Sequence, residues 1–197
     1  MTEPRPLLLA SRSPRRRTML AELGFDFSVG SADIDETPLP GEGGDAFAAR
    51  MARGKALAVA ADCPGHLVLS ADTDVALDGR ILGKPRDREH AIAMLAALSD
   101  RTHHVHSAVA VADGGGEPVL VQTVTAVRFA RVAPDEAAHY WDTGEPADKA
   151  GGYAIQGFAA RWVREVHGSV SAVIGLPLVE TVELLARFGV QPRAEAA

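Results

Sequence analysis

The chain has 197 residues, of which 47% are hydrophobic and 23% are charged. A chain of this length and composition can bury a substantial core, which excludes a disordered protein and indicates one domain, with room for a modest subdomain. The formal net charge of -6 argues against broad binding to nucleic acid or to an anionic membrane, since both require a positive surface. It leaves room for a small basic pocket that binds one phosphorylated ligand.

The single cysteine, Cys63, excludes an intrachain disulfide framework and a cysteine-rich zinc site. No apolar run approaches the roughly 20 residues that are needed to cross a bilayer. The chain also does not open on a basic segment followed by an apolar one, as a secretory leader would. We therefore expect a cytoplasmic protein that contacts no membrane.

The first predicted unit is a strand that leads directly into a helix. Apolar residues predict a short strand over residues 6–10. Ser13 is a good N-cap, Pro14 suits the first helical position, and Gly24 supplies a carboxyl-terminal stop, which together predict a helix between them. A loop rich in proline and glycine at residues 37–44 precedes a second predicted helix over residues 45–61.

The middle of the chain predicts mostly strands. A buried strand over residues 66–71 is expected to end at Asp72, and a hairpin over residues 75–82 is expected to turn at Asp78 and Gly79. A helix over residues 88–98 follows. Two long strands are then predicted over residues 103–112 and 119–132, joined by a turn at 113–116.

The last part of the chain predicts two helices and two strands. A helix over residues 134–143 begins with Asp135 and Glu136, whose charge suits the helix dipole. Strands are expected at 158–165 and 169–174, followed by a closing helix at 177–188 and a frayed end at 191–197. Strands that alternate with helices and form hairpins indicate an α/β fold with a mixed sheet.

Hydroxyl and basic side chains gather where the first strand becomes the first helix. Residues 10–17 read Ala-Ser-Arg-Ser-Pro-Arg-Arg-Arg. The start of a helix offers unpaired N–H groups and a positive dipole end to a phosphate, and arginine adds bidentate hydrogen bonds. Arginines in the first turn also oppose the dipole, a conflict that a bound polyanion would remove. A solvated basic turn is the alternative interpretation.

Carboxylates form a second candidate group. Asp33, Asp35 and Glu36 lie in a strand-to-loop stretch, and Asp72 follows an apolar strand, where it would share a face with Asp74. Magnesium prefers such oxygen ligands, and a carboxylate can also orient or deprotonate water. For each acid alone, a cap, a turn or a surface position is the alternative. Asp72 is the strongest candidate, because open α/β sheets bind ligands at strand ends.

Two lysines and a glycine-rich segment complete the candidates. Lys84 lies in a Gly-Lys-Pro turn and could reach a phosphate, whereas Lys55 lies on a helix, where a solvated position is the alternative. Residues 149–157 read Lys-Ala-Gly-Gly-Tyr-Ala-Ile-Gln-Gly. Glycines let the backbone approach a ligand, and the amide of Gln156 could read a base edge. The spacing matches neither a Walker loop nor a dinucleotide fingerprint.

Seven segments in order resemble the motifs of the Maf family of nucleotide pyrophosphatases, and they span nearly the whole chain. They read ASRSPRR at 10–16, DIDETP at 33–38, ARGKA at 52–56, SADTDV at 70–75, ILGKPRD at 81–87, DKAGGYAIQG at 148–157 and GLPLVET at 175–181. One such motif would carry little weight, but seven in one order identify the chain as a member of the family.

The resemblance implies an elongated, two-lobed α/β fold around a mixed sheet, similar to the inosine triphosphatase architecture. It implies a single domain over residues 1–197, with the active site in a cleft between the lobes, and a homodimer. The implied reaction is hydrolysis of a nucleoside triphosphate to the monophosphate and pyrophosphate with Mg²⁺ or Mn²⁺, in a subgroup that prefers dTTP and UTP. Three alternatives stay open: a 7-methyl-GTP pyrophosphatase, a nucleotide-binding regulator of septum formation with little turnover, and a nucleic-acid-binding module.

The resemblance also implies roles for individual residues. Asp72 matches the family's proton acceptor and, with Lys55 and Lys84, is an expected catalytic residue; Glu36 and Asp72 are the expected metal ligands. Whether Asp72 acts as the base or as a ligand is left open. The expected substrate-binding residues are Ser11, Arg15, Arg16, Thr73 and Gln156, and the positions of Arg15, Thr73 and Gln156 are those associated with substrate choice.

Two residues depart from the family's pattern. Arg12 replaces a residue that is often small in the family, and Asp74 follows Thr73 where an apolar residue is common. A carboxyl group at position 74 changes the local electrostatics beside the expected catalytic acid.

Overall fold

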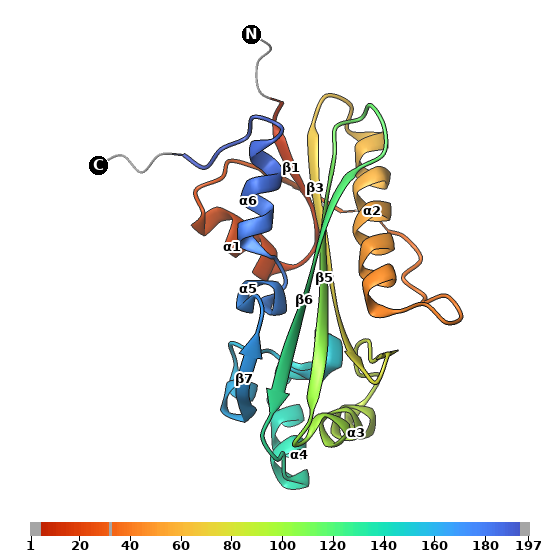
Figure 1. The fold of residues 1–197 in the computed structure, drawn as a ribbon, viewed down its shortest axis with the longest axis vertical. Coiled ribbons are helices and arrows are strands. Elements are labelled where there is room, and N and C mark those ends of the chain that lie inside the picture. Colours follow the sequence, from red (N-terminus) through yellow and green to blue (C-terminus); the bar gives the residue numbers. More distant parts are fainter. Residues whose placement is uncertain (1–4, 32, 194–197) are drawn as a thin grey trace.

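The computed structural model describes residues 5–31 and 33–193 and shows an elongated molecule around one seven-stranded mixed sheet (Figure 1). The strands are β1 (Leu7–Ala10), β2 (Ser28–Gly30), β3 (Leu67–Leu77), β4 (Arg80–Ile81), β5 (Thr102–Ala112), β6 (Val119–Phe129) and β7 (Val163–His167). Their order is β2-β1-β3-β5-β6-β7, with β4 paired to β3. β1 is parallel to both of its neighbours and the other pairs are antiparallel, so the predicted mixed sheet is confirmed.

Helices cover both faces of this sheet and one of its ends. They are α1 (Pro14–Glu22), α2 (Gly44–Asp62), α3 (Arg88–Leu98), α4 (Pro134–Asp142), α5 (Val170–Ile174) and α6 (Leu178–Ala186), with 3-10 helices η1 (Glu145–Asp148), η2 (Ala150–Gly152) and η3 (Phe158–Trp162). Helices α1, α5 and α6 lie on one side of the sheet and α2 on the other, while α3 and α4 lie at the lower end in Figure 1. The frayed end predicted at 191–197 falls mostly outside the described residues.

Local capping and turn residues fix several elements where the sequence predicts them. The Ser13 hydroxyl accepts a hydrogen bond from the backbone N–H of Arg16 at 3.5 Å and caps α1. Asp87 accepts from the N–H of His90 at 2.8 Å, and α3 then spans the predicted residues. Asp78 and Gly79 both have positive φ, of 51° and 75°, as the tight turn of a hairpin requires.

The third strand differs from the prediction near the expected site. β3 does not end at Asp72 but continues to Leu77, and it pairs with β5 from Val68 to Ala76. Asp72 therefore lies in mid-strand, and its predicted position at a strand end is wrong. The physical reason is that Val75 and Leu77 are buried in a further core, a tertiary contact that outweighs two polar residues in the strand.

Of the two strands predicted near the end of the chain, the first begins later than expected and the second is wrong. Only the last three residues of the stretch 158–165 belong to a strand, since η3 precedes them. The stretch 169–174 is the short helix α5, because the Ser169 hydroxyl accepts a hydrogen bond from the N–H of Ala172 at 3.2 Å and caps it. β2 was not predicted, since it has only three residues and two of them are exposed.

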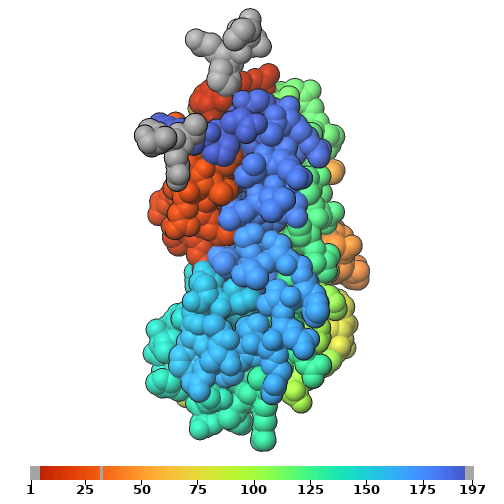
Figure 2. All heavy atoms as spheres, turned by 60° about the vertical axis from the view of Figure 1, so that its left-hand side comes forward, coloured from red at the N-terminus to blue at the C-terminus, as the bar shows by residue number. Residues whose placement is uncertain are grey.

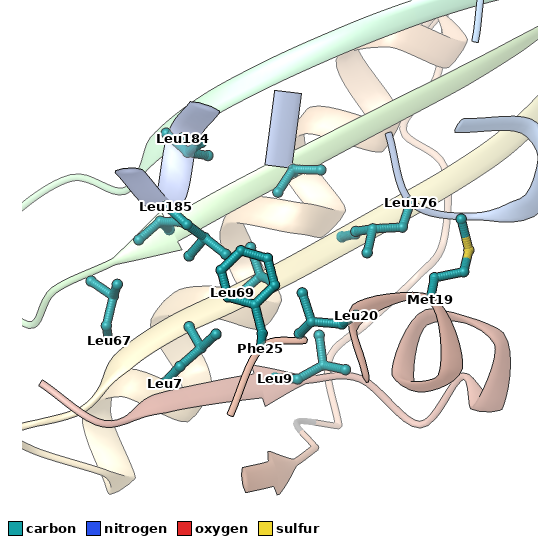
Figure 3. Packing of buried hydrophobic residues seen from close by; sticks show 13 residues of the cluster. Leu7, Leu9, Met19, Leu20, Phe25, Leu67, Leu69, Leu176, Leu184 and Leu185 are labelled. Carbon is teal, nitrogen blue, oxygen red and sulfur yellow. The ribbon is translucent and has the colours of Figure 1, made fainter. Parts of the chain in front are cut away.

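Three clusters of buried apolar residues hold these layers together. The first packs α1 and α6 against the sheet and includes Leu20, Leu69 and Leu185, which have no exposed surface (Figure 3). The second packs α2 on the opposite face through small residues such as Ala52 and Ala108. The third lies at the other end, with α3, α4 and η3. Each large apolar side chain that is fully buried stabilises the fold by about 1.5–3 kcal/mol.

Strand β3 runs from one core into another. Ala71 belongs to the cluster around α1 and α6, whereas Val75 belongs to the cluster at the other end. The surface shows the same division: α5 and α6 (blue) lie beside the red and orange amino-terminal residues above, and a cyan segment forms the lower part (Figure 2). Asp72, Thr73 and Asp74 therefore lie between two packed regions, in position to line a cleft.

Candidate active site

A cleft of about 470 Å³ brings together all nine residues that the sequence assigns to the site. These residues are Ser11, Arg15, Arg16, Glu36, Lys55, Asp72, Thr73, Lys84 and Gln156. They come from the start of α1, the loop before α2, α2 itself, the middle of β3, the turn after β4 and the segment after η2. Segments that are far apart in the sequence thus converge on one space.

The two predicted arginines are held by the carboxyl-terminal end of α5. Nε of Arg15 donates to the carbonyl of Ile174 at 3.2 Å, and Nε of Arg16 donates to the carbonyl of Gly175 at 2.7 Å. These carbonyls belong to the negative end of α5, so they offset the conflict between the arginines and the dipole of α1. Burial lowers the pKa of Arg16, and the charge of Asp72 opposes that shift.

Thr73 supports Arg16 from the middle of β3. Its Oγ1 accepts from Nη2 of Arg16 at 3.3 Å and lies 2.5 Å from the hydroxyl of Ser107. Ser107 in turn donates to the carbonyl of Ala172 at 3.0 Å, so the network joins β3, β5 and α5. Thr73 therefore fixes the Arg16 side chain, while its role in substrate choice stays a prediction.

Lys55 joins the two acids that are expected to bind metal. Its ammonium lies 2.7 Å from Oδ1 of Asp72 and 2.8 Å from Oε1 of Glu36. The side chains of Lys55 and Asp72 are only 14% and 11% exposed, whereas Glu36 is 46% exposed. A solvated position for Lys55 is therefore wrong. Exposed ion pairs contribute little to stability, but loss of one partner from a buried pair is costly.

Asp74 lies on the same face of β3 as Asp72, as the alternation of side chains along a strand predicts. The residue is 6% exposed, and its Oδ2 has no hydrogen-bond partner within the described part of the chain. Burial and the neighbouring charge of Asp72 raise the pKa of Asp74 to about 8. Its cross-strand neighbour is His106, whose Nδ1 is likewise buried without a partner among the described residues.

The glycine-rich segment packs closely on β3 and on the turn that carries Lys84. Gly151 has a φ of 68°, and a Cβ added there would lie 2.9 Å from Cβ of Val75. Only glycine combines this conformation with so close an approach. The N–H of Gly151 donates to the carbonyl of Gly83 at 2.7 Å, which ties the Lys84 turn to this segment.

A buried aromatic pair anchors the other half of this segment. The hydroxyl of Tyr153 lies 2.7 Å from Nε2 of His103 on β5. Burial lowers the pKa of His103 to about 4, so its imidazole is neutral at pH 7. This bond ties the residues before Gln156 to the sheet, and Gln156 itself is exposed at the cleft.

Cationic side chains from several elements line the cleft. They are Arg12, Arg15 and Arg16 near α1, Lys55 on α2, Lys84 in the turn after β4, and Lys149 between η1 and η2. Four carboxyl groups accompany these six cations, so the cleft carries an excess of positive charge in a chain whose net charge is -6. Such a local reversal of sign favours an anionic ligand.

Several further residues that line the cleft were not assigned to the site from the sequence, among them Lys149, Asp74 and Phe47. Lys149 opens the glycine-rich segment, where a basic residue was a usable signal, and Asp74 follows from the strand alternation. Phe47 also lines the cleft, but it is 5% exposed and has the helical spacing of an ordinary core residue. Nothing in the sequence distinguishes the role of Phe47 in the core from its role in lining the cleft.

The family model described as Maf-like protein matches residues 6–188. The chain belongs to the Maf family. A dTTP/UTP pyrophosphatase of Myxococcus xanthus is 53% identical and covers 93% of this Maf chain and 92% of its own. A dTTP/UTP pyrophosphatase of Hahella chejuensis is 49% identical, covering 95% of this chain and 94% of its own. A solved nucleoside-triphosphatase / dITP/XTP pyrophosphatase of Mycobacterium abscessus is 23% identical, with a TM-score of 0.42, over 64% of this chain and 74% of that one.

Among residues 5–31 and 33–193 of this Maf protein, no helix has both the length and the apolar character needed to cross a bilayer. Within the same residues, no three His, Cys, Asp or Glu side chains form a closed metal-binding group. Asp72 and Glu36 nevertheless supply carboxylate oxygens, and magnesium needs only one or two of these when substrate phosphates complete its coordination. The acids of the cleft thus fit a cation that is shared with a bound nucleotide.

Proposed function

We propose that this Maf protein hydrolyses dTTP and UTP to the monophosphate and pyrophosphate, in the cleft between two lobes of a single domain. The observation that carries the proposal is the cluster of Asp72, Lys55 and Glu36, flanked in one cleft by further cations that come from α1, from the turn after β4 and from the glycine-rich segment. The names of the similar bacterial proteins support the choice of substrate.

The proposed reaction is attack of water on the α-phosphorus. An O–P bond forms, the bond from that phosphorus to the bridging oxygen breaks, and pyrophosphate leaves. Arg15, Arg16 and Lys84 would balance the negative charge of the triphosphate, while Lys55 orients Asp72. Asp72 would accept the proton of the water or hold the cation. A bound Mg²⁺ or Mn²⁺, held by Asp72 and Glu36, would supply electrostatic polarisation of the phosphate oxygens.

The proposal extends to location and assembly. A cytoplasmic homodimer follows from the resemblance to the family. The net charge of -6 supports a protein that acts on a small nucleotide and binds neither nucleic acid nor an anionic membrane.

Product analysis tests the reaction itself. Purified protein incubated with dTTP or UTP and Mg²⁺ or Mn²⁺ is expected to yield monophosphate and pyrophosphate in equal amounts, measured by ion-exchange chromatography. A parallel preparation of the Asp72→Asn variant controls for contaminating phosphatases. Diphosphate and orthophosphate as the products would contradict the proposal. Nucleotide binding without turnover would favour the regulator instead.

Base choice is expected to depend on Gln156. Uracil and thymine present an acceptor–donor–acceptor edge, which an amide and backbone groups can match by hydrogen bonds. The wrong base leaves polar groups unpaired, at a cost of roughly 1–3 kcal/mol for each group. Gln156→Ala should therefore reduce the ratio of kcat/KM for UTP to that for GTP. Gln122→Ala is the control, since Gln122 donates to the carbonyl of Asp45 outside the cleft. A parent that prefers GTP or 7-methyl-GTP would contradict the subgroup assignment.

A further inference from the structure

Asp74 has no task in the reaction proposed above, although it lines the same cleft. More than nine-tenths of the residue is buried, and its Oδ2 has no hydrogen-bond partner within the described residues. Burying a carboxylate is unfavourable unless the group is paired, hydrogen-bonded or bound to a metal. A buried oxygen without a partner therefore points to a ligand that completes its surroundings.

Apart from a hydrogen bond with the neighbouring Asp72 carboxyl group, which raises the pKa of Asp74, structural roles do not account for this side chain. Asp74 lies in the middle of β3, so it caps no helix and forms no turn. Lys55 makes its ion pairs with Asp72 and Glu36 rather than with Asp74. His106 lies opposite on β5, but its ring packs against Gly44 and forms no ion pair with Asp74 among the described residues.

The chemistry of the neighbours favours a cation. Asp72 and Asp74 come from one face of one strand, and β3 is paired with β5 over its whole central part, so their relative position is fixed. The Lys55 ammonium lies 2.7 Å from Oδ1 of Asp72, so this face of β3 already places a cationic group against one of its two carboxyl groups. Carboxylate oxygens are the ligands that Mg²⁺ and Mn²⁺ prefer.

We propose that Asp74 is a second carboxylate ligand, beside Asp72, for the divalent cation used in this cleft. The two β3 residues hold the ion on a rigid strand, whereas Glu36, on an exposed loop, forms no three-acid group with them in the described part of the chain. Phosphate oxygens and water complete the coordination when a nucleotide is bound. The identity of the nucleotide rests on the proposed function, whereas binding of the ion by Asp72 and Asp74 does not.

Mn²⁺ alone is the probe, because electron paramagnetic resonance measures free Mn²⁺ without any turnover. The full chain is expected to bind one Mn²⁺, and Asp74→Asn and Asp74→Val should each raise the Kd by about tenfold or more, the scale seen when groups that support a metal site are removed. Glu180→Gln is the matched control. It removes the same charge, and Glu180 likewise has a buried oxygen without a partner among the described residues, but outside this cleft.

Thermal unfolding provides a second readout that separates a ligand from a structural residue. The metal-free Asp74→Asn protein should melt at the same temperature as the parent or higher, because asparagine keeps the shape of the side chain and replaces a carboxyl group whose ionised form burial already disfavours. Mn²⁺ should raise the Tm of the parent more than that of the variant, because only a bound ligand stabilises the native state. A lower Tm without metal, with an unchanged response to Mn²⁺, would indicate a structural role and overturn the proposal.

Three other results would also overturn it: equal Mn²⁺ affinity in parent and Asp74→Asn, no Mn²⁺ binding by the parent at millimolar concentration, or equal weakening by Glu180→Gln. Pyrophosphate release is scored separately on the unmodified protein. A protein that binds Mn²⁺ through Asp74 but releases no pyrophosphate would contradict the proposed function and leave this inference intact.

Discussion

Replacement of Asp72 by asparagine is expected to reduce turnover of dTTP or UTP by at least about 100-fold, the scale of a lost acid–base group. Asparagine preserves the shape of the side chain but removes its charge and its basicity. The structure gives the expectation a specific geometry, since Asp72 lies against the Lys55 ammonium at 2.7 Å and is buried in mid-strand between two cores. The same loss is expected whether Asp72 accepts the proton or holds the cation.

The measurement is kcat from pyrophosphate release, together with circular dichroism and Tm to establish that the variant is folded. Asp78→Asn is the matched control, because Asp78 follows the same strand but is exposed and pairs with Arg101 at the surface. A folded Asp72→Asn protein with near-normal turnover would refute the assignment of Asp72.

Arg16→Ala is expected to lower kcat/KM by about 100-fold, the scale of a removed donor that stabilises developing charge. Arg16 is held by the carbonyl of Gly175 and by Thr73, so its guanidinium is positioned before any nucleotide binds. Its neighbour Arg17 is exposed and does not line the cleft, so Arg17→Ala should have a much smaller effect. Lys84→Ala should also weaken catalysis, because it removes another positive charge that lines the cleft.

Steady-state kinetics tests whether Arg16→Ala and Lys84→Ala each lower kcat/KM more than Arg17→Ala does. Arg16→Lys adds a further comparison, since lysine keeps the charge but loses the forked geometry of the guanidinium. The Arg16→Lys variant should therefore recover only part of the activity that Arg16→Ala loses. Small and equal effects of Arg16→Ala, Arg17→Ala and Lys84→Ala would instead indicate a solvated basic surface without a role in catalysis.

Elements whose limits depend on adjacent residues could be predicted from the sequence. The Ser13 and Asp87 caps and the Asp78 turn are local devices, and the structure contains them where they were expected. The length of β3 could not be predicted, because it depends on burial of Val75 in a distant core. The helix α5 was missed because the cap at Ser169 competes with valines that favour a strand.

The same distinction applies to the candidate site: the residues that belong to it could be predicted from the sequence, but the contacts between them could not. Its nine residues could be assigned from motifs, and all of them line one cleft. Their partners could not be assigned, because Lys55 and Asp72 are 17 residues apart and Arg16 and Gly175 are 159 residues apart. The conflict between the arginines and the dipole of α1 suggested a bound anion, whereas the protein itself supplies compensating carbonyls on α5.

The passage of β3 through two cores restricts how the cleft can open. Bending the molecule at Asp72 would break the pairing of β3 with β5 and disturb packed residues on both sides. Regions with few buried contacts open at much lower free energy than a paired central strand. Motions that admit a nucleotide and release pyrophosphate should therefore concentrate in the exposed loop that carries Glu36. In this arrangement β3 stays rigid, and the motion of the exposed loop at the edge of the cleft determines how fast the nucleotide enters and pyrophosphate leaves.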